Sequence, residues 1–219
     1  MGLTNKNVRS LKRKGNLITY FNSNSIINDQ FSAIRTNIKF MQGKQKKQII
    51  LITSPEKGDG KTTITANLAV SMAKQGEKVL LIDANLREPA IHNVFKIPNQ
   101  IGLKDLLTNK ATFNDVIYKT HIGQLDIITS GHMLLNPAEL IESKTMVSLL
   151  HTVVNTYQMI LIDSPPILKS TETRVLANEC DGVVLVMSRR KTKRGKLAES
   201  RKLLELADAK ILGAIINEK

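Results

Sequence analysis

The sequence has a single cysteine, no tryptophan and few aromatic residues, and each shortage excludes a class of protein. One cysteine, Cys180, cannot form an internal disulfide, so the chain is not a disulfide-stabilised secreted domain. Aromatic residues make up 4% of the chain, which is too few for a protein that stacks single-stranded nucleic acid on aromatic surfaces. No apolar run reaches the roughly 18 residues of a membrane span, and the basic N-terminal sequence lacks the apolar stretch of a secretory signal. We therefore expect a cytoplasmic chain that does not recognise single-stranded nucleic acid by base stacking.

The sequence also has fewer acidic than basic residues. The chain has 32 Lys and Arg against 19 Asp and Glu, which gives a formal net charge of +13. The basic residues gather in three runs, at 9–14, 44–47 and 189–196 ("RRKTKRGK"). Such runs attract an acidic membrane surface, nucleic acid or an acidic protein segment alike, and a solvated surface explains each run equally well. Charge alone therefore does not identify the partner.

Short apolar runs separated by longer helical segments indicate the fold class. The runs are "IILIT", "VLLID", "LDIIT", "MILID" and "VVLVM", and "ILGAII" follows near the end of the sequence. Helical spacing predicts helices over 61–75 and 196–207, and a further amphipathic helix over 29–41 before the first strand. This alternation is typical of an α/β fold in which a mostly parallel central sheet carries helices on both faces. We expect one domain over 21–219, preceded by a flexible basic segment over 1–20.

The segment "SPEKGDGKTT" follows the first apolar run and has the character of a phosphate-binding loop. The pattern G-x-x-x-x-G-K-[ST] is met at Gly60, Lys61 and Thr62, although Pro55 stands where the first glycine belongs. Glycines in this loop let backbone N–H groups turn toward an anion, and the following helix points its positive end at the same place. We therefore predict an ATP site in which Lys61 contacts the β- and γ-phosphates and Thr62 binds Mg²⁺. The predicted nucleotide-binding residues are Gly58, Asp59, Gly60, Lys61, Thr62 and Thr63.

Two aspartates, Asp83 and Asp163, each end an apolar strand. Ligands of parallel sheets bind beyond the carboxyl ends of the strands, so both side chains are expected beside the phosphate loop. Two neighbouring buried carboxylates need a cation, which favours Mg²⁺ between them and the nucleotide, whereas a helix N-cap explains only one of them. We predict Lys61, Asp83 and Asp163 as catalytic residues and Thr62, Asp83 and Asp163 as metal ligands. Arg87 either neutralises a phosphate or an acidic substrate, or is a surface residue.

These segments together resemble the bacterial tyrosine kinases of the CpsD/CapB type, which regulate the export and chain length of capsular and other exopolysaccharides. The resemblance spans nearly the whole chain, and its most specific parts are "IRTNI" and "NPAELI". The Walker A loop "SPEKGDGKTT", the Walker A′ segment "LLIDANLREP" and the Walker B segment "MILIDSPP" are shared with other P-loop ATPases. The resemblance implies a P-loop NTPase fold of the ParA/MinD-like, deviant-Walker type, and transfer of the ATP γ-phosphoryl group to protein tyrosine.

By position, the resemblance also implies roles for single residues and for partners. Lys61 holds phosphate, Thr62 and Asp163 hold Mg²⁺, Asp83 is a base or a metal contact, and Asn217 contacts the adenine. The expected partners are protein tyrosine substrates, further copies of the chain, and a membrane-embedded polysaccharide chain-length (co-polymerase) protein whose cytoplasmic tail activates the kinase. That partner would hold the chain at the inner face of the cell membrane.

Three features depart from the family pattern. Asn85 stands where the family has a second aspartate, and an amide can bind a metal but cannot accept a proton. If that position were the catalytic base, the rate would fall by about 10²–10⁴-fold. The last tyrosine is Tyr157, so the family's tyrosine-rich tail has no counterpart. The E-x-x-R-x-x-R helix used for ring assembly reads Asp29, Ser32 and Arg35, which puts ring formation in question.

Two other functions remain open at this point. A ParA/MinD-like positioning ATPase would grip DNA or membrane through the basic run at 189–196. That class has a lysine five positions before the Walker lysine, where this chain has Glu56, with Lys57 one place later. A catalytically weakened, ATP-binding regulatory subunit is the other alternative, and it follows from Asn85.

Overall fold

A computed structural model describes the chain over residues 17–21, 26–42 and 48–218. The basic runs at 9–14 and 44–47 lie outside these ranges, and so does the predicted flexible segment up to residue 16. The end of that segment is part of the folded domain, because α2 (Ile18–Phe21) packs on the rest of the chain and Leu17 is buried. The domain therefore begins before the boundary at residue 21 that the sequence suggested.

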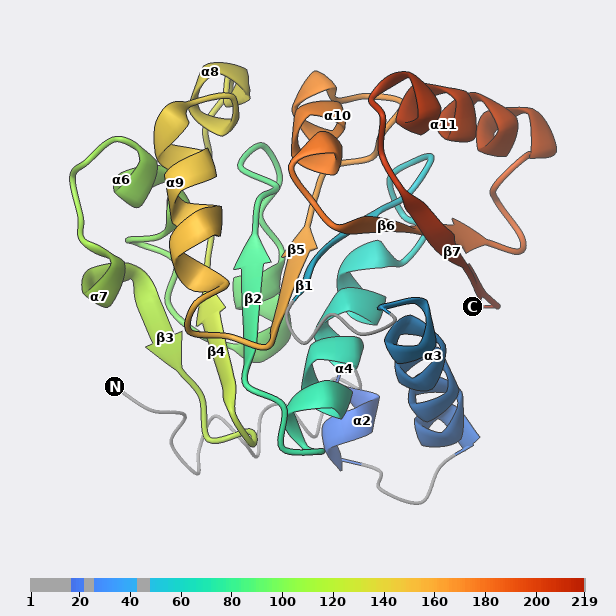
Figure 1. Cartoon of the computed structure of the whole chain (residues 1–219), viewed down its shortest axis with the longest axis horizontal. Helices are drawn as coiled ribbons and strands as arrows, with labels where there is room; N and C mark the ends of the chain where they lie inside the picture. The colour runs from blue at the N-terminus through green and yellow to red at the C-terminus, as the bar shows by residue number, and fades with distance from the viewer. Residues whose placement is uncertain (1–16, 22–25, 43–47, 219) are drawn as a thin grey trace.

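A single sheet of seven strands forms the centre of the domain. The strands are β1 (Gln48–Thr53), β2 (Val79–Asp83), β3 (Ile117–Lys119), β4 (Leu125–Ile128), β5 (Met159–Asp163), β6 (Gly182–Ser188) and β7 (Ile211–Asn217). Their order across the sheet is β3-β4-β2-β5-β1-β6-β7 (Figure 1). All neighbouring pairs are parallel except β3 and β4, which run antiparallel. The predicted α/β class with a mostly parallel sheet is confirmed, and each apolar run of the sequence forms a strand.

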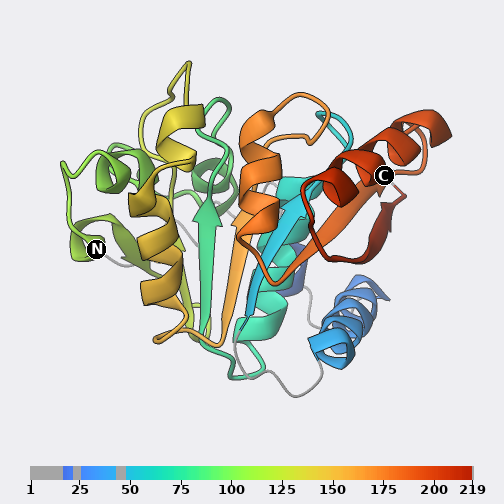
Figure 2. The same ribbon diagram turned by 45° about the horizontal axis from the view of Figure 1, so that its top comes forward.

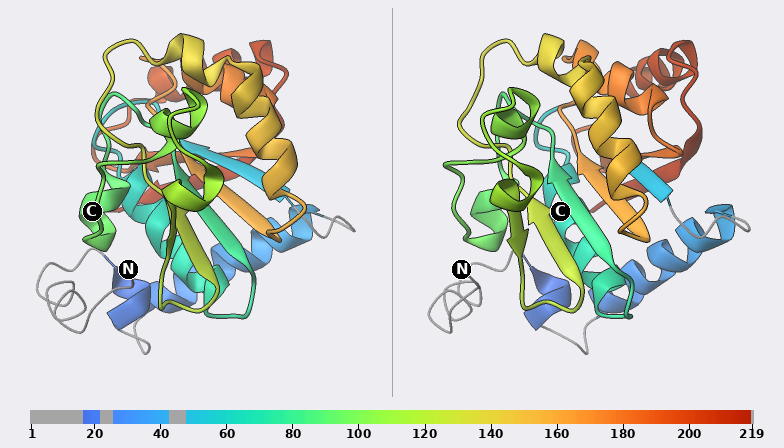
Figure 3. Two further views of the ribbon diagram at one scale, coloured as in Figure 1. Left: turned by 90° about the vertical axis from the view of Figure 1, so that its left-hand side faces the viewer. Right: turned by 60° about the vertical axis from the view of Figure 1, so that its left-hand side comes forward.

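Helices cover both faces of this sheet (Figures 2 and 3). They are α2, α3 (Ile26–Gln42), α4 (Lys61–Ala73), α5 (Ile91–Phe95), α6 (Leu103–Leu107), α7 (Phe113–Val116), α8 (Ala138–Ile141), α9 (Lys144–Val153), α10 (Thr171–Asn178) and α11 (Arg194–Leu206). Elements α2 to α5 pack in one hydrophobic cluster and α6 to α11 in the other. Strand side chains alternate between the two clusters, so in β1 Ile50 and Ile52 face one and Ile49 and Leu51 the other. The helices expected at 29–41, 61–75 and 196–207 correspond to α3, α4 and α11.

The pairing register brings the ends of three strands together. β5 lies between β1 and β2, and Asp163 at its end is opposite Ile52 of β1 and Asp83 of β2. All residues of these three strands are buried, which is why their sequences are continuously apolar instead of alternating. The phosphate loop after β1 therefore begins beside both aspartates.

Several polar side chains form hydrogen bonds that hold helices and strands of the domain together. The backbone N–H of Thr19 in α2 donates to the side-chain amide oxygen of Asn67 at 3.0 Å, and Lys74 Nζ donates to the Thr19 carbonyl oxygen at 2.7 Å. Arg35 of α3 donates to the Ser71 hydroxyl at 3.0 Å. The hydroxyl of the buried Tyr157 donates to Asp126 at 2.8 Å. The N-terminal helices are thus fixed to α4, the helix that follows the phosphate loop.

Cys180 is buried, and burial raises the pKa of its thiol, so it behaves as a small apolar side chain. No helix within the described ranges is both long and apolar enough to cross a membrane.

Candidate active site

The phosphate loop joins β1 to α4, and its shape depends on two glycines. Gly58 has a φ of 88° and Gly60 a φ of 94°, a left-handed conformation that other residues rarely adopt. A Cβ atom on Gly60 would lie 2.2 Å from Nδ2 of Asn217, at the end of β7. Glycine at position 60 is therefore required both by the backbone turn and by the close approach of Asn217.

Asp59 fixes the loop from inside. Its Oδ2 accepts the backbone N–H of Glu56 at 2.9 Å, and its Oδ1 accepts the hydroxyl of Thr192 at 3.0 Å. The side-chain amide of Asn217 donates to the Asp59 carbonyl oxygen at 3.0 Å. The Asp59 side chain thus stabilises the loop from within and does not line the pocket. Asn217 contacts the backbone of the same loop.

Lys61, Thr62 and Asp163 meet at the first turn of α4. The hydroxyl of Thr62 donates to Oδ2 of Asp163 at 2.7 Å, and that of Thr65 donates to Oδ1 at 3.3 Å. Burial raises the pKa of Asp163, although the charge of Lys61 and the two hydroxyls act to lower it. A hydroxyl and a carboxylate oxygen in contact beside a lysine form a donor set suited to a hard cation and to phosphate.

Asp83 lies beside Asp163 but faces its own loop. Its Oδ1 accepts the backbone N–H of Asn85 at 3.2 Å, and its Oδ2 accepts those of Ala90 and Ile91 at 3.1 and 3.0 Å. Burial, together with the charge of Asp163, raises the pKa of Asp83 to about 7. Its carboxylate therefore organises the turn from β2 into α5, a role close to the N-cap alternative recognised in the sequence.

We expect the ligand-free chain to lose stability as the pH rises from about 4 to about 7, because of Asp83. An aspartate in an unfolded chain has a pKa of about 3.9, whereas burial raises the pKa of folded Asp83 to about 7. Between these values the unfolded state has released a proton that the folded state keeps, so the free energy of unfolding falls with pH. Urea denaturation at several pH values measures this slope, and Asp83→Asn should reduce it. An equal slope in both proteins would contradict the assignment to Asp83.

A pocket of about 410 Å³ opens between the phosphate loop and the segment after β2. Its volume is within the range of small-ligand pockets. Its lining residues are Lys57, Gly58, Gly60, Lys61, Thr62, Thr63, Asn85, Glu88, Pro89 and Ala90. The predicted nucleotide-binding residues, apart from Asp59, thus share one cavity. Nothing in the sequence singled out Glu88, which the return of the chain toward α5 brings to the wall of the pocket.

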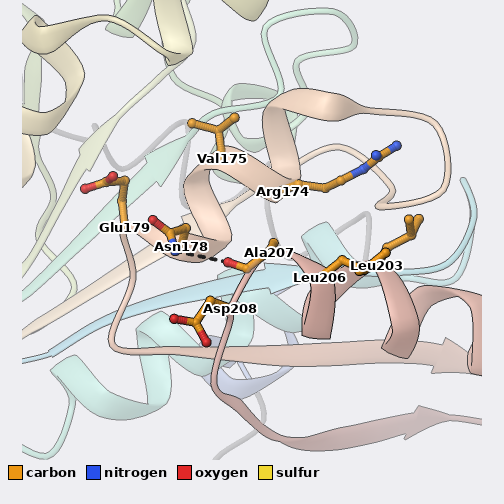
Figure 4. A pocket seen from close by; sticks show the side chains of 8 residues that line it. All are labelled: Arg174, Val175, Asn178, Glu179, Leu203, Leu206, Ala207 and Asp208. Atoms are coloured by element: carbon orange, nitrogen blue, oxygen red, sulfur yellow. Dashed lines mark hydrogen bonds between the residues drawn. The ribbon is translucent and has the colours of Figure 1, made fainter.

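A second hollow, of about 520 Å³, lies between α10 and α11 (Figure 4). Apolar Leu203 and Leu206 line it together with charged residues such as Arg174 and Asp208, and the Asn178 side chain donates to the Ala207 carbonyl oxygen at 3.0 Å. It contains no residue of the phosphate loop and neither strand-end aspartate, so we place the candidate site at the smaller pocket.

Arg87 is held by an acidic side chain of the same chain. Its Nε and NH2 atoms both lie 2.8 Å from Oε1 of Glu172, and its NH1 donates to the Leu135 carbonyl oxygen at 3.0 Å. Burial acts to raise the pKa of Glu172, but hydrogen bonds from Ser170 and Arg87 hold it below its usual value. Arg87 is exposed, as in the surface alternative, but it is paired with a carboxylate of its own chain and does not line the pocket, where it would meet a phosphate or an acidic substrate. Sequence analysis missed Glu172 because nothing local links it to a residue 85 positions away.

We expect Arg87→Met to lower the free energy of unfolding by about 2–3 kcal/mol. Removing one partner of a buried ion pair costs about 3–5 kcal/mol, and solvent reduces that cost here. Glu172 is buried, but the side chain of Arg87 is 44% exposed. The matched control is Arg201→Met, which breaks an exposed pair with Glu205 and should change stability by less than about 0.5 kcal/mol. Equal denaturation midpoints for the two variants would contradict this account.

The basic run at 189–196 borders the phosphate loop. Lys196 of α11 forms an ion pair with Glu56, and the hydrogen bond from Lys196 lowers the pKa of Glu56. Lys191 Nζ lies 3.5 Å from the position that a Cβ on Gly58 would occupy. The lysine position typical of the positioning ATPases is thus occupied here by an acidic residue that a lysine neutralises.

Comparison with known proteins agrees with this geometry. A family model described as "AAA domain" matches residues 47–199. The tyrosine-protein kinase YwqD of Bacillus subtilis is 39% identical over 211 residues, which is 96% of this chain and 89% of that protein. The chain belongs to the bacterial tyrosine-protein kinase family. Among solved structures, the chimerical protein CapA2B2 matches this bacterial tyrosine kinase with a TM-score of 0.89 and 36% identity, covering 94% of this chain and 90% of the other. The family predicted from the sequence is confirmed.

A more distant likeness relates the kinase to the positioning ATPases. The septum site-determining protein MinD of Pyrococcus horikoshii, solved with Mg-ADP, has a TM-score of 0.66 and 27% identity, covering 78% of this chain and 70% of the other. The ParA/MinD-like P-loop fold is therefore confirmed. The kinase relatives match more of the chain at higher identity, and this ranks the positioning ATPase below the kinase as an account of this protein.

Proposed function

We propose that this kinase transfers the γ-phosphoryl group of ATP to tyrosine hydroxyls of proteins. The observation that carries the proposal is the contact of Thr62 with Asp163 at 2.7 Å, since Thr62 and the adjacent Lys61 both line the pocket. In this arrangement the loop backbone from Gly58 to Thr63 would surround the phosphates, and Lys61 would neutralise the β- and γ-phosphates. The rest of the reaction is positioning and charge stabilisation, which a fixed loop and a buried carboxylate can supply.

The residues present fit Mg²⁺. The ion takes oxygen ligands, usually one or two from protein and the others from phosphate and water. Thr62 and Asp163 would supply those protein ligands, in line with the finding that the described residues contain no cluster of three or more His, Cys, Asp or Glu suited to a metal. When bound, Mg²⁺ would neutralise the charge that develops on the phosphate oxygens. Two buried carboxylates in neighbouring strands favour such a cation.

For Asp83 we propose a supporting role in place of the base or metal contact that the sequence suggested. Three backbone N–H groups hold its two oxygens, and it does not line the pocket. It would fix the segment from Asn85 to Ile91 and add negative charge next to Asp163. This is a positioning role, because Asp83 acts through the loop that it orders.

We further propose that the kinase acts in polysaccharide synthesis and export with a membrane-embedded chain-length protein, whose cytoplasmic tail would complete the site and hold the chain at the inner face of the membrane. Support comes from the resemblance to the CpsD/CapB kinases and from the CapA2B2 neighbour, which is a chimerical protein. Assembly with further copies of the chain is part of the same proposal.

The test is direct phosphotyrosine detection. The purified full chain is incubated with ATP, Mg²⁺ and a Glu–Tyr copolymer, with and without the partner's cytoplasmic tail, and with EDTA as the metal-free control. We expect tyrosine labelling that EDTA removes. If the chain binds ATP with Mg²⁺ in calorimetry but labels no tyrosine under any of these conditions, the kinase proposal fails. The weakened regulatory subunit, which Asn85 favours, would then account for the site.

A further inference from the structure

One acidic side chain faces the pocket from its solvent side. Among the described residues that line the pocket, Glu88 is the only one with a carboxylate. Asp83 and Asp163 are fully buried and do not line the pocket, and each of their four oxygens accepts a hydrogen bond within the chain. Glu88 is therefore the carboxylate that the described residues of this pocket present to solvent.

The position of Glu88 is set by two contacts. Its backbone N–H donates to Oδ1 of Asn85 at 3.2 Å, which holds the turn that carries it. Its Oε1 accepts Lys57 Nζ at 2.6 Å from the phosphate loop across the mouth of the pocket. Its second oxygen, Oε2, has no hydrogen bond to any described residue, and the side chain is 55% exposed. The carboxylate is thus anchored at one oxygen and free to accept a proton at the other.

Asn85 lines the same pocket, and its amide cannot accept a proton. A tyrosine hydroxyl, with an unperturbed pKa of about 10, must lose its proton as it attacks phosphorus, and a carboxylate in reach eases that step. Glu88 lies three residues after Asn85, on the turn that the Asn85 side chain itself holds.

We propose that Glu88 is the proton acceptor for the incoming tyrosine hydroxyl. This inference rests on the proposed kinase function. The phenolic proton passes to the carboxylate of Glu88 as the phenolic oxygen bonds to the γ-phosphorus. The bond from that phosphorus to the β,γ-bridging oxygen breaks, and its electron pair stays on ADP. Glu88 then releases the proton to solvent, which leaves phosphotyrosine, ADP and one proton as products.

The alternative is an ordinary surface ion pair between Glu88 and Lys57, which would contribute about 0–1 kcal/mol to stability and nothing to chemistry. The two roles predict different effects of removing the carboxylate. A proton acceptor makes Glu88 necessary for fast turnover at saturating ATP, whereas a surface pair makes Glu88 no more important than Glu205, which forms an exposed pair with Arg201.

The experiment compares kcat for copolymer labelling at saturating ATP in wild type, Glu88→Gln, Glu88→Asp and Glu205→Gln, a matched control that removes the carboxylate of an exposed ion pair outside the pocket. We expect Glu88→Gln to lower kcat by about 10²–10³-fold, Glu88→Asp by about tenfold and Glu205→Gln by less than about threefold. ATP affinity, measured by calorimetry, should stay within about threefold in both Glu88 variants, which also shows that they fold. Equal kcat values for Glu88→Gln and wild type, or for Glu88→Gln and Glu205→Gln, would overturn the inference.

A second variant tests whether a carboxylate at position 85 can replace the one at position 88. Asn85→Asp combined with Glu88→Gln places a carboxylate three residues earlier on the same wall. We expect the kcat of this double variant to be at least about tenfold higher than that of Glu88→Gln. A double variant as slow as Glu88→Gln would refute the shared role of the two positions. Absence of labelling by the wild type would instead refute the kinase function and this inference together, so the two failures are distinguishable.

Discussion

Lys61→Met will lower the rate of tyrosine labelling by about 10³-fold or more. Removing one group that stabilises transition-state charge in an enclosed site costs about 10²–10³-fold, and Lys61 has a second effect. Its charge lowers the pKa of Asp163, so without it the buried carboxylate takes up a proton more readily and binds Mg²⁺ less well. Methionine keeps most of the aliphatic length, so the first turn of α4 should fold normally. Phosphotyrosine formation and ATP affinity measure the two effects.

The control for Lys61 is Lys119→Met, at the end of the edge strand β3, where the side chain is exposed. This variant loses the same charge and should label tyrosine at the wild-type rate. If Lys61→Met kept a tenth of the wild-type activity, the phosphate loop would not be the site of phosphoryl transfer.

Gly60→Ala will weaken ATP binding by about 10²-fold while the sheet stays folded. Alanine at a φ of 94° is strained by about 1 kcal/mol, and its Cβ would in addition meet Asn217 Nδ2 at 2.2 Å. That amide holds the carbonyl oxygen of Asp59, so the loop must move to relieve the contact. Moved N–H groups no longer converge on one anion. Calorimetric titration with ATP and Mg²⁺ measures the loss.

Gly76→Ala is the matched control for Gly60. Its φ of 86° is nearly the same, but no atom lies within 4 Å of the added Cβ, so it carries the backbone strain without the collision. It should lose about 1 kcal/mol of stability and keep its ATP affinity. Adding Asn217→Ala to Gly60→Ala removes the colliding amide and should recover part of the binding. Unchanged ATP affinity in Gly60→Ala would mean that nucleotide binds elsewhere.

The sheet was predictable because most of its strands can be identified from their own residues. β1, β2 and β5 are buried on both faces, so each appears in the sequence as a continuous apolar run. β3 was missed because it has only three residues and its side chains are half-buried or exposed. It forms by pairing with β4 at the edge of the sheet, and no local pattern records that pairing.

The site was predictable where each group follows from its own motif. Lys61 and Thr62 open the helix after a glycine loop, and Asp163 ends a buried strand, so neighbouring residues alone indicate their place. The direction of the Asp83 carboxylate depends instead on where the chain returns at Ala90 and Ile91. The bond from Thr192 to Asp59 joins residues 133 positions apart. Such contacts join residues that are far apart in the sequence and form only in the folded chain, so no local pattern predicts them.

The place of β5 in the sheet determines when during biosynthesis this kinase can acquire its nucleotide. β1 and β2 carry the phosphate loop and Asp83, yet they pair with β5 and not with each other. A chain emerging from the ribosome has both halves of the pocket early, but the strand pairing that connects them forms only when Met159–Asp163 is inserted between them. ATP stabilises only the form that binds it, so it can assist folding only after that insertion. Nascent chains that stop before Met159 should therefore show no protection by ATP against proteolysis.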